Sequence, residues 1–337
     1  MAISKSEITK DMFEPAVVDA GMQEEIARPS ISYLQDAFRR LRKNKAAIFG
    51  AIVIAIIVIM ALIGPLMNKY GVNGQDLTRS SMPPRVSFLA NIHWLPFDGQ
   101  NNGVDAYKSH GVKENFWFGT DKLGRDLWTR LWMGTRISLF IGVVAAVVDL
   151  VIGIAYGGIS GYFGGRVDNI MQRIYEVLMG IPQLVLIILL IIILQPGLTA
   201  IILALAMTGW IGMSRIVRGQ ILRLKESEYV MAARTLGASH GRIISKHLVP
   251  NTVGIIIIHT MFSVPGAIFF EAYLSFIGLG LKPPIASLGT LINDGYQQFQ
   301  IYPYQALFPG IIISVLLLAF NAFGDGLRDA LDPKMRQ

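Results

Sequence analysis

Few ionisable side chains lie within the apolar runs of this chain, and they stand apart from one another. Asp149 interrupts the run 137–156, His259 lies in the run 251–270, and Glu271 follows that run directly. An acid inside a membrane span is costly and suggests a function, but no second acid shares the Asp149 run, which favours a buried structural partner over an ion site. His259 could line a polar path, whereas a single histidine hydrogen-bonded inside a helix bundle is the simpler interpretation.

Recognisable catalytic and cofactor-binding motifs are absent from the sequence. It contains no cysteine, no HExxH and no Gly-x-Ser-x-Gly, and its five histidines are scattered. It also lacks any Gly-Lys dipeptide, so a phosphate-binding Walker A loop cannot form. We therefore predict no catalytic, cofactor-binding or metal-binding residue in this chain, and any uphill movement of a solute would need energy from a partner. A membrane-embedded hydrolase would need a serine or aspartate dyad, and a passive channel would need no docking surface.

The longest polar interval of the second half, 226–250, combines small and basic residues. The small residues at its centre are Ala232, Ala233, Gly237 and Ala238. The basic residues in and before it are Arg215, Arg218, Arg223, Lys225, Arg234, Arg242 and Lys246. The pattern predicts a short helix, a glycine break and a second helix stopped by Pro250. A positive loop between two membrane spans is expected in the cytoplasm, and such a small-residue helix can lie close in another protein's groove. An ordinary basic connector is the alternative interpretation.

The composition is that of an integral membrane protein. The chain has 337 residues, of which 53% are hydrophobic and 16% charged. A bilayer is crossed by about 20 apolar residues, and six runs approach that length. These predicted spans lie at 46–67, 137–156, 174–194, 198–214, 251–270 and 306–323. The net charge of +7 is explained by the basic bias of cytoplasmic loops, without a nucleic-acid partner.

Six spans place both termini in the cytoplasm and divide the chain into five parts. We expect a cytoplasmic tail at 1–45 with a basic amphipathic helix, which either lies on the membrane surface or packs on its own protein. The first span acts as its own insertion signal. The remaining parts are an extracytoplasmic segment at 68–136, a membrane core at 137–323 with its cytoplasmic loop at 215–250, and a cytoplasmic tail at 324–337.

Some local features are predicted within these parts. A helix is expected to begin at Asp126 and continue into the second span, with Trp128 and Trp132 at the membrane interface. Pro182 should kink the third span. The segment 278–305 should contain a short re-entrant or interfacial helix.

The stretch 226–250 resembles the cytoplasmic loop of the permease subunits of ABC importers. That family's pattern is Glu-Ala-Ala, three residues, Gly, nine residues, Ile, any residue, Leu-Pro. The positions in register are Ala232, Ala233, Gly237 and Pro250, and the departures are Met231, His247 and Val249. Further signatures agree in order: RKNKAAIFG, FGTDKLGRD, GYFGGRVDNIMQRI, LSFIGLGLKPP, FPG and FGDGLRDALDP. From about residue 28 to its end, the chain is similar to the C-type permease subunit of oligopeptide and dipeptide ABC importers.

This resemblance implies an all-α membrane protein with six transmembrane helices, a five-helix permease core plus one N-terminal helix. It implies a subunit that is not itself an enzyme, in the cytoplasmic membrane of a bacterium. The implied partners are a sister permease subunit, two ATPase subunits that bind the ATP and Mg, an extracytoplasmic peptide-binding protein, and the peptide. The implied coupling helix is 228–236, with ATPase contacts from Tyr229, Ala232, Ala233, Arg234, Gly237 and Ala238. A similar permease for nickel or another solute is the alternative.

Overall fold

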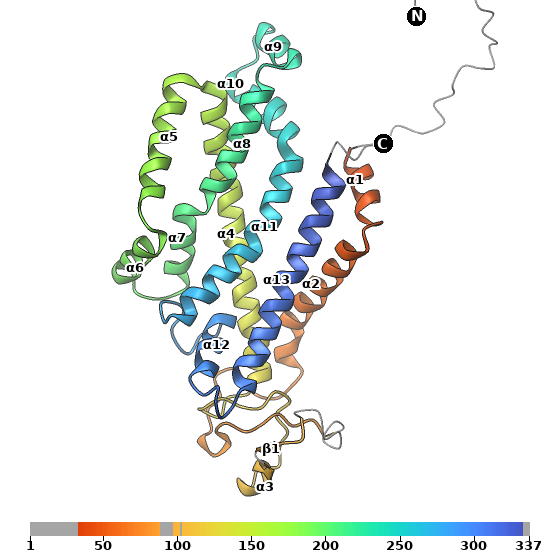
Figure 1. Ribbon diagram of the computed structural model, residues 1–337, viewed down its shortest axis with the longest axis vertical. Helices are drawn as coiled ribbons and strands as arrows, with labels where there is room; N and C mark the ends of the chain where they lie inside the picture. Colours follow the sequence, from red (N-terminus) through yellow and green to blue (C-terminus); the bar gives the residue numbers. More distant parts are fainter. Residues whose placement is uncertain (1–32, 88–96, 102, 333–337) are drawn as a thin grey trace, which may run out of the picture.

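The computed structural model describes residues 33–87, 97–101 and 103–332, and it is an elongated bundle of helices (Figure 1). Within these residues, five helices are long and apolar enough to cross a membrane, and a bent helix pair makes a sixth span if it is counted as one. The predicted all-α fold is confirmed. The expected N-terminal tail lies largely outside the described residues.

The elements follow one another along the chain as helices with one small hairpin. The N-terminal elements are α1 (Tyr33–Leu41), α2 (Lys45–Ile63), the short turns η4 (Gly64–Leu66) and η5 (Leu77–Arg79), β1 (Gln100–Asn101), β2 (Val104–Asp105) and α3 (Ala106–Ser109). The bundle continues with α4 (Leu127–Phe163), α5 (Gly165–Gly180), α6 (Gln183–Leu194), α7 (Leu198–Thr208), α8 (Trp210–Leu224), α9 (Glu228–Thr235), α10 (His240–Arg242), the π-helical η6 (Ile243–Leu248), α11 (Val249–Phe276), α12 (Leu288–Tyr296) and α13 (Tyr304–Leu331).

The first span, α2, is held against α13 and α4. The Asn44 side chain accepts a hydrogen bond from the Ala47 amide and caps its start. A Cβ on Gly50 would lie 2.6 Å from the Ala319 carbonyl oxygen, so the glycine permits the close approach of α13. At the other end, the Arg136 guanidinium donates to the α2 carbonyl oxygens of Ala61 and Leu62. The amphipathic helix α1 also contacts α13, so part of it packs on its own protein.

The central helix α4 begins as predicted but continues past the expected end of its span at residue 156. The Asp126 carboxylate accepts from the Thr129 amide and caps the start, and the helix ends at Phe163 before two glycines of positive φ. Three glycines at four-residue spacing, Gly153, Gly157 and Gly161, face α8. Added Cβ atoms would clash with the backbone or side chains of α8, so this stripe allows the two helices to touch.

The third span is broken, and its helices do not have the predicted bounds. Instead of one kinked helix at 174–194, α5 and α6 are separate helices that meet at 80°. The break falls at Ile181 and Pro182, where the backbone is extended. Proline lacks an amide hydrogen and clashes with the preceding turn, which explains why the break occurs at the predicted proline.

Three further boundaries differ from the expectation. The predicted fourth span ended near Ser214, but α8 continues to Leu224. The prediction that Pro250 stops a helix is wrong, because α10, η6 and α11 form one apolar helical stretch from His240 to Phe276. The Val249 amide donates to the Ile244 carbonyl oxygen, five residues back, in the wider turn of a π-helix. Pro250 follows these wider turns directly, and the helix continues through the proline into α11. Similarly, α13 extends to Leu331 rather than ending at 323.

The end of the bundle that carries α3 and α12 is a folded cap rather than a set of bare turns (Figure 1). Met82, Tyr107 and Phe116 are buried together there. The Gln305 amide donates to the Thr120 carbonyl oxygen at 3.1 Å, which joins the start of α13 to this cap. The expected short helix in segment 278–305 is α12, which begins in a capping box at Ser287.

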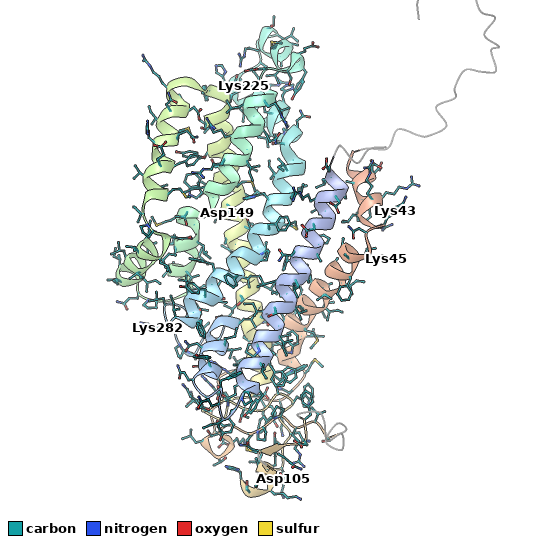
Figure 2. All side chains as sticks on the ribbon, in the orientation of Figure 1. Lys43, Lys45, Asp105, Asp149, Lys225 and Lys282 are labelled. Atoms are coloured by element: carbon teal, nitrogen blue, oxygen red, sulfur yellow. The ribbon has the colours of Figure 1, made fainter. Side chains whose placement is uncertain are left out.

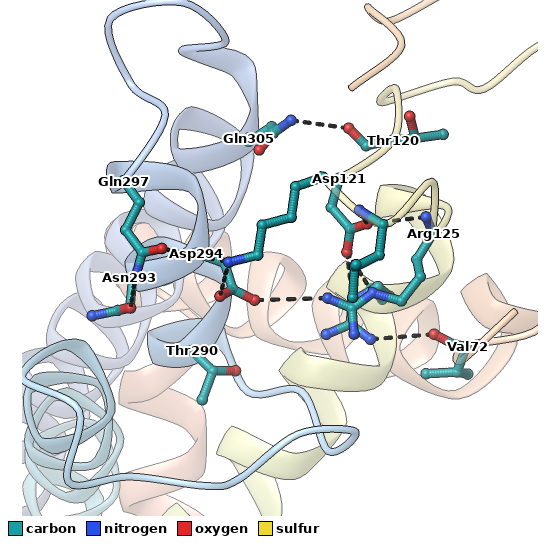
Figure 3. A network of polar contacts seen from close by, with 12 residues as sticks. Val72, Thr120, Asp121, Arg125, Thr290, Asn293, Asp294, Gln297 and Gln305 are labelled. Carbon is teal, nitrogen blue, oxygen red and sulfur yellow. Dashed lines mark hydrogen bonds and ion pairs between the residues drawn. The ribbon is translucent and has the colours of Figure 1, made fainter. Parts of the chain in front are cut away.

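A polar network fixes α12 to the chain that precedes α4 (Figure 3). The Arg125 guanidinium lies 2.6 Å from the Asp121 carboxylate, and both side chains are buried. Asp294 of α12 lies 3.8 Å from both Arg125 and Lys122. This network positions α12 at the end of the bundle opposite α9.

Candidate docking site

The helix α9 lies at the other end of the bundle, together with α1 and the end of α13 (Figure 1). It follows Ser227 in extended conformation and has an acidic residue, Glu228, in its first turn. Its underside is anchored by Val230, which is fully buried. Val230 packs in a cluster with Ile221 of α8 and Ile243 of η6. The short helix is therefore attached to the membrane helices on both sides of the loop.

The exposed surface of α9 and of the residue after it includes several apolar side chains. Tyr229, Met231 and Ala232 are exposed, and the side chain of Leu236 is 87% accessible to solvent. An apolar residue so exposed, directly after a short helix, has no cover within the described chain. Isolated exposed apolar residues are common, but a cluster of them on one side of an ordered loop is typical of an interaction surface.

Gly237 ends α9 in a Schellman motif. The Gly237 amide donates to the Arg234 carbonyl oxygen and the Ala238 amide donates to the Ala233 carbonyl oxygen, both at 3.0 Å. This motif needs a left-handed residue, and Gly237 has φ +80°. A Cβ at Gly237 would meet no atom within 4 Å, so its surface is open. The predicted glycine break after the short helix is therefore observed at Gly237.

The predicted contact residues divide into two groups. Tyr229, Ala232 and Gly237 are exposed. Ala233 and Ala238 are half-buried, and Ala238 packs against the anchoring cluster around Val230. Arg234 is also exposed, and its guanidinium lies 5.6 Å from the centre of the Tyr162 ring.

Contacts that the sequence reasoning missed hold the loop on α4. The Tyr162 hydroxyl is 2.8 Å from His240 Nδ1, and Lys225 Nζ donates to the Gly161 carbonyl oxygen at 3.1 Å. Val230 was also missed, because in EYVMAART it stands between Tyr229 and Met231, and nothing in the sequence separates it from the exposed residues beside it. Lys225 could not be paired with Gly161 from the sequence, because 64 residues separate them and their contact depends on how α4 meets α8.

A bidentate ion pair stabilises the base of the loop. Arg218 of α8 donates from Nε and from a terminal nitrogen to the two oxygens of Asp168, each at 2.6 Å. The Ser160 hydroxyl donates to the same carboxylate at 2.6 Å. Three helices, α4, α5 and α8, are therefore joined just inside the docking loop.

The isolated acids of the membrane region have different surroundings. Glu271 is fully buried and accepts from the hydroxyls of Ser138 at 2.9 Å and Ser275 at 2.7 Å. These hydrogen bonds join α4 to α11, which is a structural role. Asp149 and His259 line a cavity instead. Among the described residues, no three His, Cys, Asp or Glu side chains gather as metal ligands.

The chain belongs to the family of binding-protein-dependent transport system inner membrane components, whose pattern it matches over residues 153–337. Residues 32–84 match the N-terminal transmembrane domain of oligopeptide transport permease C. It is therefore a multi-pass inner-membrane protein, a permease-type subunit rather than an enzyme, and works in a complex with ATPase and binding-protein partners.

Its relatives match over almost their whole length. The chain is 46% identical to the oligopeptide transport system permease protein OppC of Bacillus subtilis, covering 98% of this chain and 99% of the relative. It is 48% identical to the dipeptide transport system permease protein DppC of the same organism, covering 93% and 89%. The OppC protein of Escherichia coli K12 is 39% identical, covering 90% and 92%.

Proposed function

We propose that this chain is a permease subunit of an ATP-driven importer that carries oligopeptides or dipeptides across the cytoplasmic membrane. The relatives with full-length similarity are named for peptide transport, which favours peptides over nickel or another solute. The observation that carries the coupling role is the exposed end of α9. Its apolar side chains and its glycine cap project from a rigid base and have no cover in the described chain.

The proposed complex has one sister permease subunit and two ATPase subunits. The ATPase subunits bind ATP and Mg, since this sequence has no nucleotide-binding motif. Tyr229, Ala232, Ala233, Gly237 and Ala238 belong to the docking region, with Leu236 and Met231 added from their exposure. Arg234 belongs to this region too, and its contact with Tyr162 holds it beside α4.

The connections of α9 suggest how movement of an ATPase reaches the membrane. Val230 links α9 to both α8 and η6, and η6 continues directly into α11. A displacement of α9 therefore acts on two membrane helices at once. Close packing makes such a unit move as a body, which suits the rocking of permease halves between two openings.

The orientation follows from the same proposal. The end with α9, α1 and the end of α13 faces the cytoplasm, in line with its many basic residues, and both termini lie on that side. The folded cap with α3 and α12 faces the peptide-binding protein.

Purification and transport together test this function. A tagged chain expressed with the genes beside its own should purify with two ATPase subunits and a second permease. The complex in vesicles should then accumulate a radiolabelled peptide only when ATP and the binding protein are present. A complex that lacks ATPases, or one that takes up nickel and not peptide, contradicts the proposal.

A further inference from the structure

A cavity of about 710 Å³ lies toward the end of the bundle that carries α9, among α8, α11 and α13. Its volume falls within the range of ligand pockets, roughly 300–1,000 Å³. A Cβ on Gly324 of α13 would lie 3.1 Å from the Phe262 ring of α11, so these two helices touch there. One turn further toward α9, Arg328 and Ile258 line the cavity instead, and the two ribbons diverge in Figure 1. The described chain therefore leaves an open space between α11 and α13.

One wall of the cavity is an apolar strip on α11. Val253, Ile255 and Ile258 belong to its lining, which begins on this helix at Pro250. From Pro250 to Ile258 the helix rises by about 12 Å, at 1.5 Å per residue. Such a strip is long enough to contact several methylene groups of an extended hydrocarbon chain, and apolar surface of this kind gains stability when it is covered.

Two arginines bring positive charge to the same cavity from different helices, Arg223 from α8 and Arg328 from α13. Both side chains are exposed, so a ligand in the cavity can reach them. Arg223 donates to the neutral Gln220 Oε1 at 2.6 Å. Neither arginine belongs to an ion pair of the described residues. Asp332 is the single acid among the described lining residues, so positive charge is in excess.

The cavity lies at the depth of a membrane surface. The first span begins at Lys45, and Gly326 of α13 faces Ala47 at that start. Arg328 follows Gly326 by two residues, a rise of only about 3 Å. Figure 2 shows Lys43 and Lys45 beside the last turns of α13, and basic side chains at the end of an apolar span mark the level of the lipid headgroups. In contrast, α9 projects further out (Figure 1), so an ATPase docked on α9 lies beyond this level.

We propose that this cavity binds an anionic phospholipid from the leaflet on the side of α9. The phosphate-bearing headgroup lies at Arg223 and Arg328, since a guanidinium matches phosphate oxygens with parallel hydrogen bonds. An acyl chain covers the strip on α11. A free phosphate would use the arginines and leave that strip uncovered, whereas a lipid uses both features. The bound lipid joins α13 to α11, the helix that continues from the docking loop. This inference goes beyond the proposed function and holds whichever solute is carried.

Photolabelling of the permease–ATPase complex tests this site. The complex is placed in phosphatidylcholine nanodiscs that contain a trace of phosphatidylglycerol with a diazirine in its acyl chain. A parallel sample contains phosphatidylcholine with the same diazirine. After illumination, mass spectrometry of the digested chain locates the label. We expect label within 250–258, about tenfold more of it from phosphatidylglycerol, as basic contacts at a membrane surface select anionic lipid.

A pair of double variants separates the cavity from general surface charge. Arg223→Gln with Arg328→Gln should lower the label from phosphatidylglycerol to the phosphatidylcholine level. Arg39→Gln with Lys43→Gln removes two exposed charges near the same end but outside the cavity lining, and it should keep the preference. A preference that survives the loss of both cavity arginines, or one that disappears equally in the two double variants, overturns the proposal.

The unaltered complex gives a decision of its own, even if a variant does not assemble. Equal labelling by the two lipids, or label that avoids 250–258, overturns the proposal. Soluble glycerol phosphate and trialanine are added as competitors in further samples, and neither should displace the label. Displacement by glycerol phosphate would identify a site for free phosphate, displacement by trialanine would identify a path for the peptide, and either result would overturn the assignment to lipid.

Discussion

At the scale of single residues, the docking region depends on one glycine at its outer surface and one valine buried beneath it. Gly237 has φ +80° and an open surface, so its role is to end α9 and leave space outside it. Val230 is fully buried and fastens the same helix from beneath. The family pattern identifies the glycine in advance. The valine is outside the pattern and becomes visible only from its packing.

Replacing Gly237 should impair docking to the ATPase while leaving membrane insertion of the chain intact. Gly237→Leu places a branched side chain in a left-handed conformation, at a cost of about 1 kcal/mol, and fills the open surface beside Leu236. We expect peptide uptake to fall strongly while the protein still inserts in the membrane, as measured by uptake and by membrane-fraction immunoblots. Gly241→Leu is the control, because Gly241 is exposed but lacks a positive φ. Normal uptake by the Gly237 variant would count against the docking assignment.

Truncating Val230 should loosen α9 without changing its outer surface. Val230→Ala removes two buried methyl groups, at a cost of roughly 1–2 kcal/mol. We expect faster hydrogen exchange of the α9 amides and a lower peptide-stimulated ATPase rate in the complex. Met231→Ala, at an exposed neighbouring position, should leave the exchange unchanged. Identical exchange in the two variants would show that Val230 does not anchor the helix.

At the scale of elements, helix boundaries show where sequence reasoning succeeds and where it fails. The apolar runs located the membrane spans because a helix that crosses the hydrocarbon layer must be predominantly apolar. They could not give the full length of α4 or α8, since both helices leave the apolar zone and continue with residues that pack on each other, such as Gly157 and Val217. Pro250 was misread because a proline usually ends a helix, and the sequence did not reveal the π-helical turns directly before it, after which the helix continues.

The same limit applies to the site. The pattern in 226–250 predicted the small-residue helix and the glycine break, and both are observed. It did not reveal that the Arg234 guanidinium also lies against the ring of Tyr162, which comes from a distant part of the chain. Long-range pairs of this kind depend on how helices cross, which spacing along one helix does not encode.

The ion pair between Asp168 and Arg218 should carry measurable stability because it joins two helices. Asp168→Asn leaves the guanidinium with a weaker partner, at a cost of about 1–3 kcal/mol. We expect a lower melting temperature for the solubilised complex. Glu176→Gln, which breaks an exposed pair with Arg173 on the same helix, should cause no measurable change. Equal melting temperatures for both variants would show that the pair between Asp168 and Arg218 contributes no stability.

At the scale of the whole molecule, the bundle has two unlike ends. One end presents α9, α1 and the end of α13, and the other is a folded cap that α12 and the chain before α4 build together (Figure 1). A continuous helical stretch, His240 to Phe276, runs from the docking loop toward that cap. Movement at one end therefore has a direct mechanical path to the other.

The absence of cysteine from the chain makes its orientation easy to measure. Single cysteines in place of Ser239, near α9, and Lys108, in α3, should react from opposite sides of the membrane. We expect a membrane-impermeant maleimide to label Lys108→Cys in spheroplasts and Ser239→Cys only after permeabilisation. The reverse pattern would invert the proposed topology.

The central claim is that the exposed end of α9 meets an ATPase subunit, and site-specific photo-crosslinking tests it most directly. A benzophenone amino acid at Leu236 in the assembled complex should cross-link to an ATPase subunit. The same probe at Val104 should not, because this exposed residue lies in β2, which pairs with β1 at the opposite end of the bundle. A Leu236 probe that reaches only lipid, or only the peptide-binding protein, would contradict the account.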